Sequence, residues 1–403
     1  MSLNLKGQSW LESDRSKSVM AALEAEGGKD CARYVGGCVR NAILGAPVDD
    51  VDIATQLVPE RTVAALKAAG IRVVPTGIDH GTVTAVLKGQ PFEITTLRHD
   101  VETDGRHAVV SFTTDWAEDA ARRDFRLNAL YASADGTLHD PTGAGIDDAL
   151  NGRIVFVGEP HQRIREDYLR ILRFYRFQSW YGRGEPDVAG SEACAALADG
   201  VKTLSAERVS KELLKLLAAR DPKAAVAAMD QAGVLVALVP QADRTTFDAM
   251  VDATSDAVLR LSALLPDDAQ SVGAIAKALR LSNAQRDRLI AAVAPFDAYM
   301  DDHSARIMIW QDGAEAFTDR TYRAQAAGAD ANRMQALRQL AVEWTVPSMP
   351  VGGRDLANMG IKAGPQTGLI LKTFTASWLA DDFPDHGHNE RLLEAISKVV
   401  APE

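Results

Sequence analysis

Two aspartates separated by one apolar residue could bind a metal ion. Asp50 and Asp52 lie on either side of Val51, and Ile53 follows them. Alternate side chains of a strand point to opposite faces, so both carboxylates would share one face while Val51 and Ile53 point into the core. Neighbouring carboxylates repel each other unless a cation lies between them, and Mg²⁺ prefers oxygen ligands. The pattern therefore predicts a Mg²⁺ site at Asp50 and Asp52.

A pair of glycines precedes the two aspartates. Gly36 and Gly37 follow the apolar run Tyr34–Val35 and come before a helix-like run, Val39–Leu44, that contains Arg40. A strand, a glycine turn and a helix form a unit whose amide N–H groups can hold phosphate. A phosphate site beside a metal-binding strand indicates nucleotidyl transfer. The alternative is an ordinary turn followed by a solvated strand end.

The residues from Gly36 to Thr55 carry a resemblance to a known family. The pattern G-G-x-V-R…L-G…D-x-D-I-A-T resembles motif A of the class II tRNA nucleotidyltransferases, which include CCA-adding enzymes and bacterial poly(A) polymerases. The family usually has Asp where this chain has Asn41. The resemblance also implies a third acidic residue, for which Glu93 in the expected strand Phe92–Leu97 is the candidate. A solvated strand glutamate is the alternative for Glu93.

A second motif, R-R-D-F-x-x-N-A, contains Arg123, Asp124 and Asn128. The guanidinium group of Arg123 offers a fork for phosphate oxygens. Asp124 and Asn128 are four residues apart and would share a face if helical, where a carboxylate and an amide suit ribose hydroxyls. The segment resembles the family's motif B, which implies that Asp124 reads the 2′-OH, and the alternative is a salt-bridged helix. The preceding polar stretch, 98–116, resembles the family's flexible loop, with a disordered surface loop as the alternative.

The stretch from Gln162 to Phe177 is expected to form one helix that reads the base. Asp167 and Arg170 match the family's E-D-x-x-R motif and would be neighbours on one face. Cytosine and adenine each show an amine beside a ring acceptor, which suits a carboxylate and a guanidinium, whereas uracil and guanine show the opposite arrangement. Arg173 and Arg176 continue the stripe, and the family has nucleotide-proximal arginines at these places. A solvated arginine face is the alternative for Arg176.

Composition limits the remaining possibilities. A chain of 403 residues is long enough for more than one domain, and no apolar run reaches the length of a membrane span. Its three cysteines form no CxxC pair, which argues against disulfide scaffolds and zinc ribbons and fits a cytoplasmic setting. A net charge of −11 requires any RNA-binding surface to be a local basic patch.

We expect an α+β fold in which an N-terminal palm-like α/β domain with a mixed or antiparallel sheet precedes an all-helical neck, body and tail. The expected divisions are a catalytic head at 1–150, a base-recognition neck at 151–220 and a tRNA-binding body and tail at 221–403. The resemblance is strong from about Tyr34 to Leu217 and weaker from Gly352 to Lys398. Within it, Gly77–Val83 is closest to the CCA-adding branch.

The resemblance implies Mg²⁺-dependent, template-independent addition of C and A to the 3′ end of tRNA from CTP and ATP, with release of pyrophosphate. It implies that Asp50 and Asp52 hold the metals and that Gly37, Arg40 and Arg123 hold the triphosphate. Two alternatives remain at this point. One is an A-adding, CC-adding or poly(A) polymerase of the same family, and the other is a catalytically idle RNA-binding protein on this fold.

Overall fold

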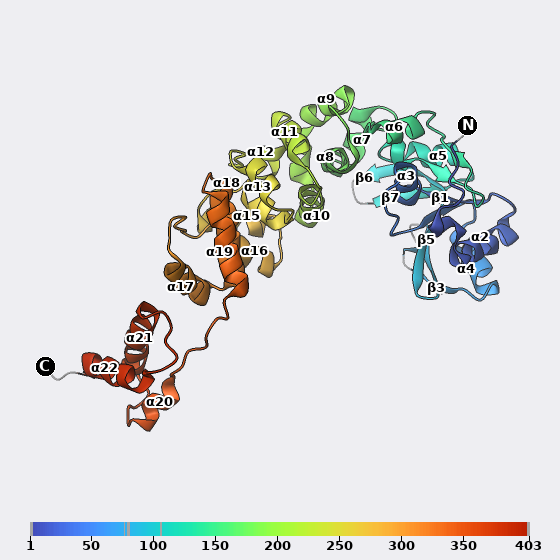
Figure 1. Ribbon diagram of the computed structural model, residues 1–403. Helices are drawn as coiled ribbons and strands as arrows, with labels where there is room; N and C mark the ends of the chain where they lie inside the picture. Colours follow the sequence, from blue (N-terminus) through green and yellow to red (C-terminus); the bar gives the residue numbers. More distant parts are fainter. Residues whose placement is uncertain (1–2, 76, 79–80, 105–106, 401–403) are drawn as a thin grey trace. The chain divides into compact units, whose positions relative to one another are not determined.

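The computed structural model describes residues 3–75, 77–78, 81–104 and 107–400 (Figure 1). The chain divides into two compact units. Unit 1 contains Met1–Ala242, Ser255–Leu261 and Lys277–Leu281. Unit 2 contains Asp243–Thr254, Ser262–Ala276 and Ser282–Glu403. The described strands all precede residue 140, and the remainder is helical, which confirms the predicted α+β class.

In the described part of unit 1, seven strands form one sheet in the order β3-β4-β5-β2-β1-β8-β9. Strands β2 and β5 pair in parallel and the other neighbours pair antiparallel, so the sheet is mixed, as predicted. The strands are β1 (Ala32–Val35), β2 (Asp52–Thr55), β3 (Arg72–Val74), β4 (Thr82–Leu87), β5 (Gln90–Thr96), β8 (Tyr131–Ala132) and β9 (Leu138–His139).

The stretch predicted as a flexible loop is instead a two-stranded ribbon of β6 (Arg98–Asp104) and β7 (His107–Phe112). Residues 107–112 read HAVVSF, and β-branched and aromatic residues favour extended backbone. The prediction was wrong because it followed the polarity of the stretch rather than this propensity. In the segment Gly77–Val83, Asp79 and His80 lie outside the described residues.

Five helices accompany the described strands of unit 1: α1 (Ser9–Glu12), α2 (Asp14–Gly27), α3 (Gly37–Leu44), α4 (Pro59–Ala68) and α5 (Trp116–Ala121). Pro59 stands at the first position of α4, where its missing N–H costs nothing. The chain between α1 and α2 is extended at Ser13, whose Oγ accepts from the Ser16 amide at 3.1 Å and caps α2.

The helices that follow the sheet in unit 1 begin with α6 (Gly145–Asn151), α7 (Pro160–Glu166) and α8 (Leu169–Tyr181). They continue with α9 (Val188–Ala196), α10 (Ala206–Leu217), α11 (Lys223–Gln231) and α12 (Val234–Leu238). The 3₁₀ turns are η2 (Arg126–Asn128) and η3 (Ala198–Thr203). Helix α8 packs against α10 and α11, and Phe174 stacks on Phe156 with ring centroids 5.5 Å apart. This packing holds α8 against the segment that follows the second motif.

The predicted single helix Gln162–Phe177 is two helices, α7 and α8, with a break at Asp167. The backbone of Asp167 is extended, with φ −155° and ψ 106°. Its carboxylate accepts from the Leu169 amide at 3.1 Å, so the side chain supplies the bond that a continuous helix would make. The one-helix prediction was therefore wrong at the residue proposed to read the base.

Unit 2 is helical throughout its described residues. Helices α14 (Ala257–Ser262) and α15 (Ala269–Ala278) are shared between the two units. The remainder are α13 (Phe247–Ala253), α16 (Asn283–Ala292), α17 (Asp302–Asp312), α18 (Ala314–Ala326), α19 (Ala331–Glu343), α20 (Gly353–Asn358), α21 (Pro365–Ala380) and α22 (His388–Val400). Ser282 and Gln285 form a capping box at the start of α16, and Pro365 opens α21. None of the helices described here is long and apolar enough to cross a membrane.

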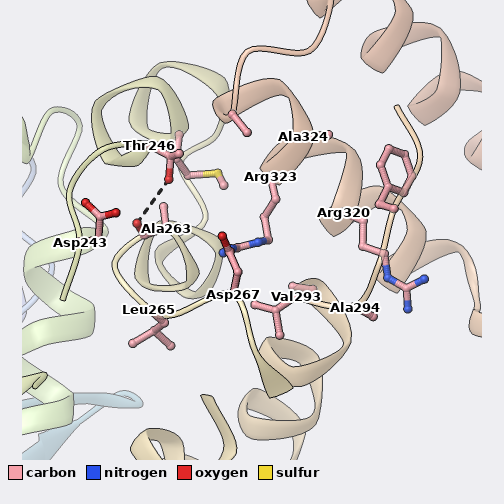
Figure 2. Close-up of a pocket in the computed structure, with 14 residues that line it drawn as sticks. Asp243, Thr246, Ala263, Leu265, Asp267, Val293, Ala294, Arg320, Arg323 and Ala324 are labelled. Atoms are coloured by element: carbon pink, nitrogen blue, oxygen red, sulfur yellow. Dashed lines mark hydrogen bonds and ion pairs between the residues drawn. The ribbon is translucent and has the colours of Figure 1, made fainter. Parts of the chain in front are cut away.

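Unit 2 encloses a cavity of about 230 Å³ whose lining includes Arg320 and Arg323 of α18 (Figure 2). Arg320 donates to the Ala291 carbonyl at 2.8 Å, and Arg323 donates to the Ser262 carbonyl and to Asp267. Both carbonyls lie in the last turn of a helix, where basic side chains commonly satisfy free acceptors. These two arginines therefore attach α18 to the ends of α16 and α14.

Candidate active site

A cavity of about 560 Å³ in unit 1 collects the residues that carry the sequence motifs. Every predicted nucleotide-binding residue except Arg176 lines it, together with Asp52. The lining comprises Gly36, Gly37, Arg40, Asp52, Arg98, Arg122, Arg123, Asp124, Asn128, Asp167, Leu169, Arg170, Arg173, Phe177 and Arg208. Seven arginines against three aspartates make it a local basic site in a chain whose net charge is −11.

The glycine pair forms one wall of this cavity. Gly36 has φ +70°, a left-handed conformation that favours glycine, and its amide donates to the Leu130 carbonyl at 3.1 Å. Helix α3 begins at Gly37, so the amides of its first turn have no acceptor within the helix. Such a helix start attracts phosphate oxygens.

The acidic residues lie at the start of the parallel strand pair. Val51 and Ile53 are buried while Asp50 is exposed and Asp52 half-buried, which confirms the predicted alternation. Asp52 and Glu93 are partners in the β2–β5 register, and a second hollow of about 260 Å³ is lined by Asp50, Asp52 and Glu93 among others. Asp52 lines both hollows and so lies where they meet.

Electrostatics at Asp52 favour a bound cation. Burial, followed by the negative charges of Glu93 and Asp50, raises the pKa of Asp52 to about 6, although Arg123 opposes this effect. A divalent cation would offset that repulsion, and the donor set is all oxygen, so these residues fit a hard metal ion. Within the described residues, no group of three or more His, Cys, Asp or Glu side chains is arranged to hold a metal. Two carboxylates completed by substrate phosphates are a usual arrangement for such ions.

Arg40 is buried and largely engaged by protein partners. Its guanidinium donates to Asn128 Oδ1, to the Tyr181 hydroxyl at 2.8 Å and to Asn41 Oδ1 at 2.9 Å. Asn41 in turn donates to the Pro47 carbonyl at 2.7 Å, a bond that the family's usual aspartate could not make. Arg40 thus connects α3 with the second motif and with α8.

Asp124 accepts four hydrogen bonds. Oδ1 accepts from the Phe125 amide at 2.8 Å and from Asn128 Nδ2 at 2.9 Å, and Oδ2 accepts two bonds from Arg173. Burial alone would raise the pKa of Asp124, but the charge of Arg173 and these hydrogen bonds lower it to about 2. The predicted proximity of Asp124 and Asn128 is confirmed, although the segment between them is the 3₁₀ turn η2 rather than an α-helix.

Asp167 and Arg170 both line the cavity; the Arg170 amide donates to the Asp167 carbonyl at 3.0 Å, but their described side chains bond other partners and not each other. Asp167 Oδ2 accepts from Arg208 Nη2 at 2.6 Å, and Arg170 Nη1 donates to Glu166 and to the Arg163 carbonyl. The break between α7 and α8 separates the two side chains into different hydrogen-bond networks. Each of these two side chains, which the sequence predicts to read the base, therefore has a protein partner of its own.

Family comparisons agree with this arrangement. Residues 32–155 match the family model described as "Poly A polymerase head domain", and residues 189–245 match "Probable RNA and SrmB- binding site of polymerase A". The mitochondrial CCA tRNA nucleotidyltransferase 1 of Mus musculus is 35% identical over 382 residues, which cover 91% of this chain and 86% of that protein. The chain belongs to the CCA tRNA nucleotidyltransferases.

Other members of the CCA tRNA nucleotidyltransferases extend the match. The CCA-adding enzyme of Limosilactobacillus fermentum is 31% identical over 411 residues, covering 96% of this chain and 98% of that protein. The fold matches the Bacillus stearothermophilus CCA-adding enzyme in complex with CTP, with a TM-score of 0.73, 23% identity and coverage of 96% and 99% of the two chains. A complex of the Thermotoga maritima CCA-adding enzyme with tRNA matches with a TM-score of 0.63 and 18% identity, over 95% of this chain and 94% of that one.

Arg176 is the predicted nucleotide-binding residue that does not line the cavity of this CCA tRNA nucleotidyltransferase. Its Nε donates to Glu212 Oε2 at 2.5 Å, and its guanidinium lies 4.3 Å from the centre of the Phe177 ring. Arg173 is 3.8 Å from the same Glu212. Arg176 thus holds the back of α8 against α10, and a direct contact with nucleotide remains a prediction.

Five residues that line the cavity were not predicted to do so. They are Arg98, Arg122, Leu169, Phe177 and Arg208. Asp119, which bonds Arg122 and Arg123 from outside the cavity, was not predicted either. One signal was readable: Asp119 precedes the two arginines by three and four residues, the spacing of neighbours on a helix. The bond between Arg208 and Asp167 could not be predicted from local spacing because the two residues are 41 positions apart.

Proposed function

We propose that this chain adds C and A nucleotides to the 3′ end of tRNA, using CTP and ATP and releasing pyrophosphate, without a nucleic-acid template. The observation that carries the proposal is the single cavity in which a strand aspartate, a helix start and the Asp167/Arg170 pair meet. The names of the relatives support the choice of CCA addition within the family. The reaction is attack of the tRNA 3′-hydroxyl on the α-phosphate.

Asp50 and Asp52 would hold Mg²⁺, which when bound lowers the pKa of the attacking hydroxyl and neutralises charge on the leaving group. Their position at the start of β2 lets Asp52 face both the cavity and the neighbouring hollow. Glu93 stands beside Asp52 in the register and is proposed as a third carboxylate that adds negative charge to this edge. All three roles follow from donor chemistry and position.

The triphosphate would lie against the start of α3. Amides at Gly37 and in the first turn of α3 supply neutral donors, and the Arg123 guanidinium lies beside the glycine turn. Arg40 keeps one Nη1 hydrogen beyond the bonds described above and can contribute it to phosphate. The charged and neutral donors together would hold the leaving pyrophosphate in line with the attacking oxygen.

The ribose would contact Asp124 and Asn128. A carboxylate offers about four acceptor positions, and Asp124 already fills four with protein donors. A 2′-OH that donates to Asp124 must therefore displace or share one of those donors, most simply an Arg173 hydrogen, because Arg173 can turn toward Glu212. This exchange would make recognition of the sugar dependent on Arg173.

The base would be read by Asp167 and Arg170. The Asp167 carboxylate accepts from the exocyclic amine of cytosine or adenine, and Arg170 donates to the adjacent ring nitrogen. Uracil and guanine would leave Asp167 facing a carbonyl and Arg170 facing a ring N–H. Arg173 and Arg176 are proposed to support this helix face beside the nucleotide.

We also propose the division of labour expected from the sequence, with catalysis in 1–150, base recognition in 151–220 and tRNA binding in 221–403. The second family match, at 189–245, overlaps the last two of these parts. A cytoplasmic location is proposed from the absence of CxxC pairs and the many bacterial relatives, although the mammalian relative carries a mitochondrial designation.

The decisive experiment is nucleotide incorporation on a tRNA transcript that lacks its 3′ end, with CTP and ATP offered singly and together. CCA addition requires that CTP alone adds two residues, that ATP alone adds none, and that both together add three. Addition of A to a transcript ending in CC, without any addition of C to the shorter transcript, identifies an A-adding enzyme, and long A tracts identify a poly(A) polymerase. No incorporation by folded protein that still binds tRNA would contradict the proposal and identify an idle RNA-binding protein.

A further inference from the structure

Asp119 is a buried carboxylate at the centre of an arginine network. It lies in α5, and 1% of its side chain is exposed. Its oxygens accept from Arg122 Nε at 2.8 Å, from Arg123 Nη2 at 2.9 Å and from the Tyr131 hydroxyl at 2.7 Å. Buried carboxylates are costly unless they are paired and hydrogen-bonded, so a position with this many donors is strongly specified.

The partners of Asp119 lead to the nucleotide cavity. Arg122 and Arg123 line the cavity whereas Asp119 does not. The backbone amide of a third lining residue, Arg98, lies 3.4 Å from Asp119 Oδ1. A single carboxylate behind the wall therefore contacts three arginines of that wall.

The geometry of Arg123 shows what this contact achieves. Nε and Nη2 form one edge of the guanidinium and point to Asp119 Oδ2 at 3.2 and 2.9 Å. Nη1, on the other side, lies 3.7 Å from the position that a Cβ on Gly36 would occupy. One edge is thus anchored while the other is directed at the glycine turn, where the first amides of α3 are also available.

Tyr131 completes the anchor from the sheet. Its hydroxyl donates to Asp119 Oδ2 and accepts from Arg123 Nε at 3.2 Å. The ring stands edge-on to Trp116 with centroids 5.2 Å apart, so strand β8 and the start of α5 hold it on both sides. The anchor therefore rests on regular secondary structure and not on a loop.

The charge of the anchor persists over any working pH. Burial by itself would raise the pKa of Asp119, but the charges of Arg123 and Arg122 and the Tyr131 hydrogen bond lower it to about 2. Without this anion, neighbouring guanidinium groups would repel each other across the cavity wall. The Asp119 carboxylate therefore orients the two arginines and reduces the electrostatic repulsion between them.

We propose that Asp119 is a positioning residue that holds Arg122 and Arg123 in the orientation that binds the β- and γ-phosphates of the incoming nucleotide. The inference rests on the proposed function for the identity of the ligand. It assigns a role to a residue outside the cavity that none of the sequence motifs singled out. Asp119 does not line the cavity and would act through the two arginines.

The test compares equilibrium binding of CTP and CMP to the full chain, in the presence of Mg²⁺, for wild type and Asp119→Asn. Asparagine keeps the size of the side chain and removes its charge. Because CMP lacks the β- and γ-phosphates, we expect CTP affinity to fall about tenfold or more while CMP affinity changes less than about twofold. Inorganic pyrophosphate, measured as a competitor, should weaken in parallel with CTP.

Two further variants separate positioning from folding. Asp319→Asn is the matched control, because Asp319 is also buried and accepts two bonds from one arginine, Arg288, but lies in unit 2. It should leave the CTP-to-CMP affinity ratio unchanged. Tyr131→Phe keeps the ring and removes one donor to Asp119, so it should lower the ratio of CTP affinity to CMP affinity several-fold. If Asp119→Asn does not fold, this variant tests the positioning role instead.

Equal loss of CTP and CMP affinity in Asp119→Asn and Tyr131→Phe, or no loss of either, would overturn the inference. The binding ratio does not depend on nucleotide transfer. If wild type fails to extend tRNA, the proposed function fails, while a selective loss of CTP and pyrophosphate binding would still establish that Asp119 positions a phosphate site.

Discussion

Substituting Asp167 by asparagine should invert one hydrogen bond at the base while preserving the local backbone. Asp167 Oδ1 accepts from the Leu169 amide at 3.1 Å, and an asparagine oxygen can keep that bond. The NH₂ group must then occupy the Oδ2 position, which in wild type faces Arg208. A donor would therefore replace an acceptor at the atom proposed to meet the base.

The expected change in nucleotide preference follows from the number of hydrogen bonds that change and from their exposure to water. Cytosine loses a matched hydrogen bond at its amine, and uracil gains one at its carbonyl. A buried mismatch costs on the order of 1–3 kcal/mol. Because 26% of the Asp167 side chain is exposed, water can replace part of each lost bond. We therefore expect an effect near the low end of that energy range. The preference for CTP over UTP should fall about tenfold, which is equivalent to about 1.4 kcal/mol.

The assay is steady-state kcat/KM for each of the four nucleotides on one tRNA primer. The matched control is Arg208→Ala, which removes the same ion pair but leaves the carboxylate, so it should slow all four nucleotides and keep their ratios. If Asp167→Asn also lowers all four by one factor, Asp167 only stabilises the break between α7 and α8. Base reading by this carboxylate would then be refuted.

Three other predictions concern the carboxylates. Asp50→Ala and Asp52→Ala should abolish incorporation without lowering the melting temperature, since each removes a like-charge repulsion; near-wild-type incorporation would contradict the assignment. Asp124→Ala should reduce preference for CTP over dCTP in primer extension and, because Arg173 loses its carboxylate partner but is partly exposed and keeps Glu212 nearby, should cost roughly 1–3 kcal/mol in denaturant unfolding; an unchanged sugar ratio would exclude the role in sugar reading. Asp119 and Asp124 each have a pKa lowered from 3.8 to about 2, so each contributes about 2 kcal/mol of stability above pH 4 that is lost as pH falls toward 2. Acid titration of unfolding should show a shallower loss over that interval in Asp119→Asn than in wild type, and equal slopes would argue against the lowered pKa of Asp119.

Much of the site could be predicted because its residues are close in sequence. The alternation at Asp50 and Asp52 needs only the two-residue period of a strand, and burial of Val51 and Ile53 confirms it. The glycine turn and the start of α3 follow from one short segment. The strand period and the glycine turn depend only on residues that are close in sequence, so the sequence alone is sufficient to predict them.

Pairings between distant segments could not be predicted in this way. Arg40 bonds Tyr181 across 141 positions, and Arg173 bonds Asp124 across 49. The break at Asp167 is another case, since the residues from Gln162 to Phe177 contain no glycine or proline to end a helix. A partner from α10, Arg208, engages the extended residue, and that contact exists only in the folded chain.

Under the proposed function, these distant pairings would affect how the site selects a base. Asp167 is bonded to Arg208, and Arg170 is bonded to Glu166. Both side chains proposed to read the base therefore already have hydrogen-bond partners in the protein. A nucleotide must therefore exchange its own hydrogen bonds for existing ones, and only the difference contributes to affinity. For cytosine or adenine the exchange is nearly even, because an acceptor meets a donor at both atoms. Uracil or guanine would break both protein contacts and restore neither, so the wrong base would bind at a net loss, and the difference between bases would be set by Asp167 and Arg170.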